Sequence, residues 1–300
     1  MTRSKLWLVS LALVALTAGA AQGEMWAGGY LGGSWGASDS SMLTFTPTGL
    51  PRYYSASVKT NYTGDLQGAF QGGLKIGAWF EKSGVLAGIN FPTWMKYFGF
   101  YTDFSYHRLN FRHNQGQFNV RVRYEGNNNG GDDVGPFQSS SYSFVAPFGM
   151  YTEGYAATWA FMFAGRYGFF PDADVPFGRL QLMLAVGPAI LFSGQTPTIT
   201  ALQSVSGFGP YAQLKFNSQS STDICLAVET GLRFMALKNV SIDATFKYRY
   251  AAPSYSYSLK RFAYVVTANN NNINYLAGAD LKLDPTYHLF SFQIGANYHF

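Results

Sequence analysis

The chain has 300 residues, of which 47% are hydrophobic, 18% are aromatic and only 12% are charged. An ordinary soluble domain carries about 25% charged residues, and a helical membrane protein shows apolar runs of roughly 18 residues or more, which this chain lacks after its N-terminal segment. The formal net charge of +5 is small and scattered, so it does not favour nucleic-acid binding, and the single cysteine, Cys225, excludes an internal disulfide.

The N-terminal segment has the pattern of a secretory signal peptide. Arg3 and Lys5 form a positive region, an apolar stretch covers residues 6–17, and small residues dominate 18–23. We therefore expect residues 1–21 to be removed on export, with cleavage between residues 20 and 23. Residues 22–300 would then form a single mature domain.

Eight later segments alternate with a period of two, as β-strands do when one face is apolar and the other is small or polar. Roughly 9–11 residues of tilted strand cross a bilayer, and an even number of strands lets a barrel close with both ends on one side. The sequence therefore predicts an all-β fold, an eight-stranded antiparallel transmembrane up-and-down β-barrel. The predicted strands cover about residues 26–35, 69–80, 97–109, 155–168, 180–192, 224–236, 240–250 and 287–300.

The connections between these strands alternate in length. Three are short and predicted to be periplasmic (81–96, 169–179 and 237–239), whereas the long, predicted extracellular ones cover 36–68, 110–154, 193–223 and 251–286. The long connections are rich in Tyr, Ser, Asn and Gly, a composition that suits adaptable recognition surfaces. Their alternation, as in Tyr255–Ser258, also favours strand ribbons that extend above the membrane.

Charge distribution decides which strand face meets lipid. A Lys or Arg on the lipid face at the bilayer midplane costs roughly 2–4 kcal/mol. One face of each predicted strand is nearly free of charge, so the opposite face must line the lumen; a soluble lipocalin-type barrel would show the reverse pattern. The charged lumen residues are predicted to be Lys75, Asp103, Arg166, Glu229, Arg233, Asp243, Lys247 and Arg249.

The hairpin formed by the sixth and seventh predicted strands can be placed in register. A three-residue turn at 237–239 places Arg233 opposite Asp243 and Glu229 opposite Lys247. Opposite charges across a strand pair are favourable, and buried charges need partners. Lys75 and Asp103 fall at a similar depth on neighbouring strands, so we expect a lumen closed by an ion-pair network.

The functional consequences of this architecture are mostly exclusions. An eight-stranded barrel is just wide enough for side chains to fill, so a general diffusion porin is disfavoured, and a narrow ion or small-solute conduit remains the alternative. Enzymes need a nucleophile and base, or an acid–base cluster, near the outer rim. The four histidines, His107, His113, His288 and His299, form no such arrangement, and no metal-ligand spacing appears. We expect no enzyme, no cofactor and no metal; an outer-leaflet lipid-modifying enzyme is a distant third hypothesis.

The eight-strand layout, the signal peptide, the run Tyr30–Trp35 and the terminal Tyr298-His299-Phe300 resemble the OmpA-like/OmpX-like transmembrane barrels of the outer-membrane β-barrel family. The resemblance implies location in a Gram-negative outer membrane among lipid and lipopolysaccharide, as a monomer. It also implies that Tyr298 and Phe300 belong to an assembly signal for the barrel-assembly machinery. The function implied is structural or adhesin-like, with a possible extracellular surface ligand for the long loops.

Overall fold

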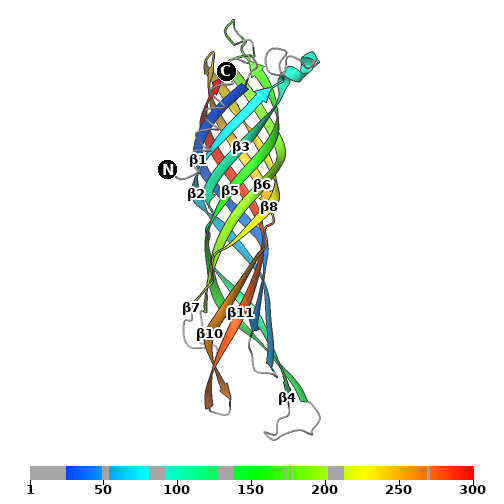
Figure 1. Cartoon of the computed structure of the whole chain (residues 1–300), viewed down its shortest axis with the longest axis vertical. Helices are drawn as coiled ribbons and strands as arrows, with labels where there is room; N and C mark the ends of the chain where they lie inside the picture. The colour runs from blue at the N-terminus through cyan, green and yellow to red at the C-terminus, as the bar shows by residue number, and fades with distance from the viewer. Residues whose placement is uncertain are drawn as a thin grey trace, which may run out of the picture.

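The computed structural model describes residues 25–48, 54–80, 92–126, 138–171, 173–175, 177–201, 213–268 and 271–300, so the predicted signal peptide lies outside the described residues. The described chain forms one long antiparallel tube, with both the first strand and the C-terminus near one end (Figure 1). A short 3-10 helix η1, Thr93–Tyr97, lies at that same end. The strands are β1 Met25–Thr48, β2 Tyr54–Trp79, β3 Phe98–Arg108, β4 Phe111–Gly126, β5 Gln138–Phe169, β6 Leu180–Ala201, β7 Gln213–Lys215, β8 Gln219–Leu237, β9 Val240–Ala251, β10 Tyr255–Ala268 and β11 Asn271–His299.

Eight of these strands form a closed ring in the order β1–β2–β3–β5–β6–β8–β9–β11, with β11 returning to β1. The seam is paired to its end, because Trp26 lies opposite His299 and the Phe300 N–H donates to the Met25 carbonyl at 2.9 Å. Closure leaves no strand edge in the ring, which is the condition for a sheet to span a bilayer. The predicted eight-stranded barrel is confirmed.

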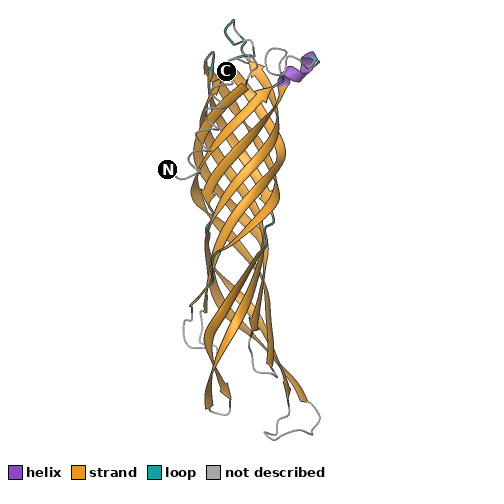
Figure 2. Ribbon diagram, in the orientation of Figure 1, coloured by secondary structure: helices purple, strands orange, loops and turns teal. Residues whose placement is uncertain are grey.

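The three remaining strands continue barrel strands beyond a short interruption. On β5, Tyr155 pairs with Arg108 of β3 and Thr152 pairs with Phe111 of β4, so β4 prolongs β3 along the same neighbour. By the same criterion β10 prolongs β9 along β11, and β7 lies in line with β8 along β6. The long connections are therefore largely paired strands, and the ribbon interpretation is confirmed (Figure 2).

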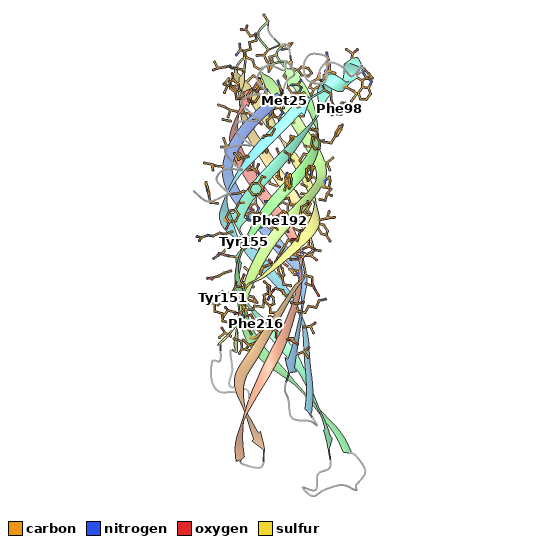
Figure 3. The ribbon with its side chains drawn as sticks, in the orientation of Figure 1. Met25, Phe98, Tyr151, Tyr155, Phe192 and Phe216 are labelled. Atoms are coloured by element: carbon orange, nitrogen blue, oxygen red, sulfur yellow. The ribbon has the colours of Figure 1, made fainter. Side chains whose placement is uncertain are left out.

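The outward face of the ring is apolar. Outward positions 226–234 of β8 and 242–250 of β9 carry no charge, and side chains project from the barrel wall all along its length (Figure 3). A closed ring with such a face is an outer-membrane β-barrel, and this chain therefore resides in the outer membrane. Among the described residues, no helix is long and apolar enough to span a membrane. The most exposed large apolar side chains include Leu31, Phe70, Leu74, Phe163, Leu184, Ile224 and Ile294.

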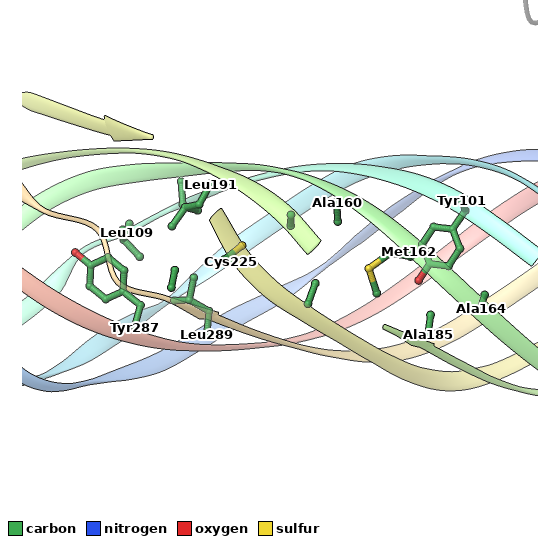
Figure 4. Packing of buried hydrophobic residues seen from close by; sticks show 14 of the residues in the cluster. Tyr101, Leu109, Ala160, Met162, Ala164, Ala185, Leu191, Cys225, Tyr287 and Leu289 are labelled. Atoms are coloured by element: carbon green, nitrogen blue, oxygen red, sulfur yellow. The ribbon is translucent and has the colours of Figure 1, made fainter. Parts of the chain in front are cut away.

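The interior is packed rather than hollow in two apolar regions. Inside the ring, Tyr287, Leu109, Leu191 and Leu289 gather toward one end, while Tyr101 and Met162 lie toward the other (Figure 4). A second cluster fills the tube beyond the ring on the extracellular side, which is "above" the membrane although Figures 1 to 3 draw it at the bottom. Its members are Phe148, Met150, Ile199, Phe216, Tyr255, Tyr257, Leu281 and Leu283.

The turn between β8 and β9 differs from the prediction. Met235 pairs with Ser241, in the predicted register, but Leu237 then pairs with Val240. The extra residue is Ala236, which forms a bulge, so the turn has two residues, Lys238 and Asn239, instead of three. A bulge adjusts the local twist at a barrel rim without changing which face the preceding side chains occupy.

Candidate functional site: the barrel lumen

The structure places all eight predicted lumen charges inside the barrel. Each has at most 5% of its surface exposed, and Arg233 and Arg249 have none. Alternation explains this, because the inward positions around these residues are odd-numbered on β2, β3, β8 and β9 and even-numbered on β5. Charges with so little access to water need partners inside the barrel.

Four of these residues form a connected ionic cluster at the centre of the lumen. Lys247 Nζ lies 2.9 Å from Glu229 Oε2, as the predicted register requires, and also contacts Asp103 Oδ2. Lys75 Nζ lies 2.5 Å from Glu229 Oε1. Two lysines and two carboxylates from β2, β3, β8 and β9 therefore share their charges across the tube, and we call them the central cluster.

The partners within the central cluster are not simply those adjacent on the sheet. Lys75 and Asp103 lie directly opposite each other on β2 and β3, at the same depth as expected. Yet Lys75 bridges to Glu229, and Asp103 to Lys247. The pairs cross the lumen because a narrow barrel brings facing walls as close together as neighbouring strands. This cross-linking ties opposite walls together.

An aromatic hydroxyl completes the central cluster. Tyr30 on β1 donates a hydrogen bond to Asp103 Oδ1 at 2.7 Å, and the Lys75 ammonium lies 4.9 Å from the centre of its ring. A side chain on Gly73 would lie 2.4 Å from the Tyr30 ring, so glycine is what admits the phenol here. Asp103 is thus held from β1 as well as from β9.

A second set of charges closes the periplasmic end, where the chain termini of the ring lie. Arg233 makes a bidentate contact with Asp243, with both hydrogen bonds at 2.8 Å, again as the register predicts. Its guanidinium carbon lies 4.5 Å from the centre of the Trp26 ring. The guanidinium carbon of Arg166 lies 4.3 Å from the ring centre of Trp79 and 3.9 Å from that of Phe177. Arginine planes stacked on aromatic rings gain cation–π attraction and exclude water.

Arg249 lies on the extracellular side of the central cluster and has a different environment. Its guanidinium donates to three neutral oxygens, Gln71 Oε1 at 3.0 Å, Thr158 Oγ1 at 3.0 Å and Ser105 Oγ at 3.3 Å. No ion pair among the described residues includes it. The hydrogen bonds reach β2, β3 and β5 from β9, so they too cross the lumen.

The histidines and the cysteine occupy separate positions. His107 and His299 are buried inside the tube, and His299 Nε2 lies 3.0 Å from Ser241 Oγ. His288 faces outward and hydrogen-bonds the Tyr248 hydroxyl at 2.7 Å, while the neighbouring Ser291 faces the lumen. Cys225 is a buried free thiol in the apolar packing. Within the described part of the chain, no group of three or more His, Cys, Asp or Glu side chains could hold a metal.

The terminal strand lies where its pattern predicts. Tyr298 is 49% and Phe300 41% exposed on the outer face, and their ring centres are 5.2 Å apart in an edge-on contact. Both lie at the periplasmic end beside Met25. The long connection after β2 returns through η1, where Trp94 is exposed and packs edge-on against Phe98.

The tube above the membrane is held by its own core and by tyrosine hydroxyls. Tyr255 on β10 donates to Ser193 Oγ at 2.6 Å and Tyr257 donates to the Gln195 carbonyl at 3.3 Å, both on β6. Burial raises the pKa of Tyr255 to about 12, so its phenol stays protonated and able to donate. These bonds link β10 to β6 across the interior of the tube.

Sequence reasoning missed the aromatic filling of the lumen. Trp26, Tyr30, Trp79 and Tyr101 are all buried there. The alternation of large residues with glycine on β1 and β2, as in Tyr30 beside Gly32, carries the signal. A glycine opposite a large inward ring indicates a lumen that is filled layer by layer.

Comparison with known proteins gives likenesses in architecture. No protein-family model matches the chain, and no curated protein matches it. The chain is similar to the outer membrane protein OprG of Pseudomonas aeruginosa, with 13% identity over 93% of this chain and 98% of that one, at a TM-score of 0.36. It is also similar to the attachment invasion locus protein Ail of Yersinia pestis, with 12% identity, 92% and 99% coverage and a TM-score of 0.30. A third similar structure is the outer membrane protease OmpT of Escherichia coli, with 9% identity over 92% of this chain and 97% of that one, at a TM-score of 0.24.

Proposed function

We propose that this outer-membrane barrel is a non-enzymatic, monomeric surface protein whose tube above the membrane mediates adhesive or structural contacts. The supporting observation is that this tube has a packed core of its own, built from β5, β6, β10 and β11 and from β7 with the residue that follows it. Loops without a core of their own would not bury large side chains such as Phe148, Met150 and Leu283. A preorganised surface loses little conformational entropy when it binds, which favours recognition.

The proposal is tested by trimming the hairpins without disturbing the ring. Ser258 pairs with Asp280, and Arg123 pairs with Ser141, so deleting residues 259–279 or 124–140 and closing each cut with Asn-Gly keeps the pairing below it. Deletion cells carrying full-length, trimmed or no protein are compared for adhesion to extracellular-matrix proteins and a glycan array. Adhesion that needs the full hairpins supports the proposal. Equal adhesion of trimmed and full-length strains, with equal surface amounts of folded protein, contradicts it.

The lumen is proposed to lock the barrel rather than to conduct. The ion pairs that cross the lumen and the apolar cap of Leu109, Leu191 and Leu289 support this role. The alternative, a narrow conduit opened by rearranged ion pairs, predicts single-channel currents in planar bilayers that change in Glu229→Ala. We expect the refolded protein to show no discrete currents.

Assembly is proposed to depend on the terminal strand. Tyr298 and Phe300 present two exposed rings at the periplasmic end, where the barrel-assembly machinery could read them. Replacing both with Ser should lower the amount of folded barrel in cells, while the same variant should still refold from urea into detergent. Equal loss in both assays would make the rings a stability element instead.

A further inference from the structure

The buried charges at the middle of the lumen do not sum to zero. The central cluster supplies two lysines and two carboxylates, which satisfy one another. Arg249 lies two positions from Lys247 on the same inward face of β9 and adds one more positive charge. This layer therefore holds a net charge of +1 inside a closed tube, and an uncompensated buried charge costs several kcal/mol.

The same layer holds buried hydrogen-bonding atoms without partners. Arg249 Nε and Gln71 Nε2 lack one, although neither side chain is exposed. Because Gln71 Oε1 accepts from the arginine at 3.0 Å, the amide nitrogen is the remaining donor end. Leaving a buried donor unpaired costs about 1–3 kcal/mol, so two vacant donors beside one uncompensated cation need a common explanation.

A third unpartnered atom, His107 Nε2, belongs to the neighbouring position. His107 pairs with Gln71 across β2 and β3, and its Nδ1 donates to the Arg108 carbonyl at 2.8 Å. In the neutral tautomer Nε2 is then an acceptor, which a water molecule can satisfy. A water alone would not offset the charge of Arg249.

The walls around Arg249 combine small and aliphatic side chains. Ala227 on β8 and Leu289 on β11 are its cross-strand neighbours, and Ser105 and Thr158 face it from β3 and β5. Buried Ala156 and Ala160 flank Thr158 on the same inward face. Leu289, and Leu191 as the strand partner of Thr158, bring the apolar cap directly against the layer, while the central cluster lies on its periplasmic side. The layer is therefore enclosed.

We propose that the Arg249 layer binds one small monovalent anion of the halide class. An anion accepts hydrogen bonds and donates none, so it can take both Arg249 Nε–H and a Gln71 Nε2–H while neutralising the arginine. Glu229 and Asp103 both already serve the lysines, and Asp223, a further carboxylate on β8, accepts a hydrogen bond from the Ser221 hydroxyl. The anion would act as a structural ion that completes the lumen, independent of what the surface tube binds.

The direct test is bromide in place of chloride. Crystals of the refolded full mature chain grown or soaked in sodium bromide should show an anomalous peak within hydrogen-bonding reach of Arg249 and Gln71. In solution, the thermal midpoint should rise with chloride when gluconate holds the ionic strength constant. A water at that position with no anomalous signal, or a midpoint indifferent to the choice of anion, overturns the proposal.

A pair of variants separates ion binding from general damage. Gln71→Glu places a carboxylate where the anion would sit, so it should fold, raise the midpoint in gluconate and lose the chloride dependence. Arg233→Gln removes a lumen cation that already has Asp243, so its chloride dependence should match that of the unmodified protein although its midpoint falls. If Gln71→Glu keeps the chloride dependence, the anion is not at this layer and the proposal fails.

Discussion

The two halves of the tube are the same sheet, yet they are filled differently. Within the ring the interior holds eight charged side chains beside its apolar packing, whereas the core of the tube beyond it consists of Phe, Met, Leu, Ile and Tyr. The reason lies on the outer face. Where lipid surrounds the ring, the apolar residues are needed outside, so the polar half of each alternating strand must point inward. Where water surrounds the tube, the sheet packs as an ordinary soluble sandwich does, with apolar residues inside.

The largest test of this contrast removes one charge from each half. Lys247→Ala leaves Asp103 and Glu229 with one ammonium between them, and breaking a buried pair in this way costs about 3–5 kcal/mol. Lys282→Ala is the matched control, because Lys282 lies 3.0 Å from Asp284 but its side chain is 57% exposed. Surface pairs contribute at most about 1 kcal/mol. Urea unfolding of both variants in detergent, followed by tryptophan fluorescence, should show the difference, and similar losses would mean that the lumen is hydrated.

Next comes a test of the core above the ring. Leu283→Ala removes a buried side chain from that cluster and should destabilise it by about 2–5 kcal/mol. The strand pairing of the ring within the membrane is untouched by this substitution. We therefore expect protease cleavage in the upper tube, while the ring keeps its heat-dependent electrophoretic shift. Loss of both together would show that the two halves unfold as one unit.

Much of this contrast could be predicted from the sequence, and the limits are physical. Period-two alternation and the cost of charge in lipid identify the eight strands and assign Arg233, Asp243, Glu229 and Lys247 to the lumen in the right register. Pairing across the lumen could not be predicted, because it depends on the tilt and stagger of the whole barrel. Local pattern gives the neighbours of Lys75 on its own sheet and not the facing wall.

A smaller effect is expected from adding a side chain at Gly73, the inward glycine beside the Tyr30 ring. Gly73→Ala adds a methyl group 2.4 Å from the Tyr30 ring and 2.5 Å from the Phe104 carbonyl oxygen, which should push the phenol away from Asp103, disturb the β2–β3 pairing and cost about 1–3 kcal/mol. Gly33→Ala is the control on the outer face, where a methyl group meets nothing within 4 Å. Equal stability of the two variants, again by urea unfolding, would mean that Tyr30 can move without loss.

The smallest expected effect concerns the tyrosine bonds that tie β10 to β6. Tyr255→Phe deletes the hydrogen bond to Ser193 and should weaken the upper tube by about 1 kcal/mol, measured as faster proteolysis there. Tyr106→Phe, on the outer face where Tyr106 is 52% exposed, should change nothing.

Ionisation of the Tyr255 hydroxyl should make the protease resistance of the upper tube depend on pH in alkali. The pKa of Tyr255 is raised from 10.0 to about 12 on folding, so its neutral form favours the folded state. That contribution is complete below pH 10 and is lost as the pH rises toward 12. The unmodified protein should therefore lose protease resistance of the upper tube more steeply over this interval than Tyr255→Phe does. Because the ring is shielded by lipid, a simultaneous loss of the ring would contradict the division into two differently filled halves.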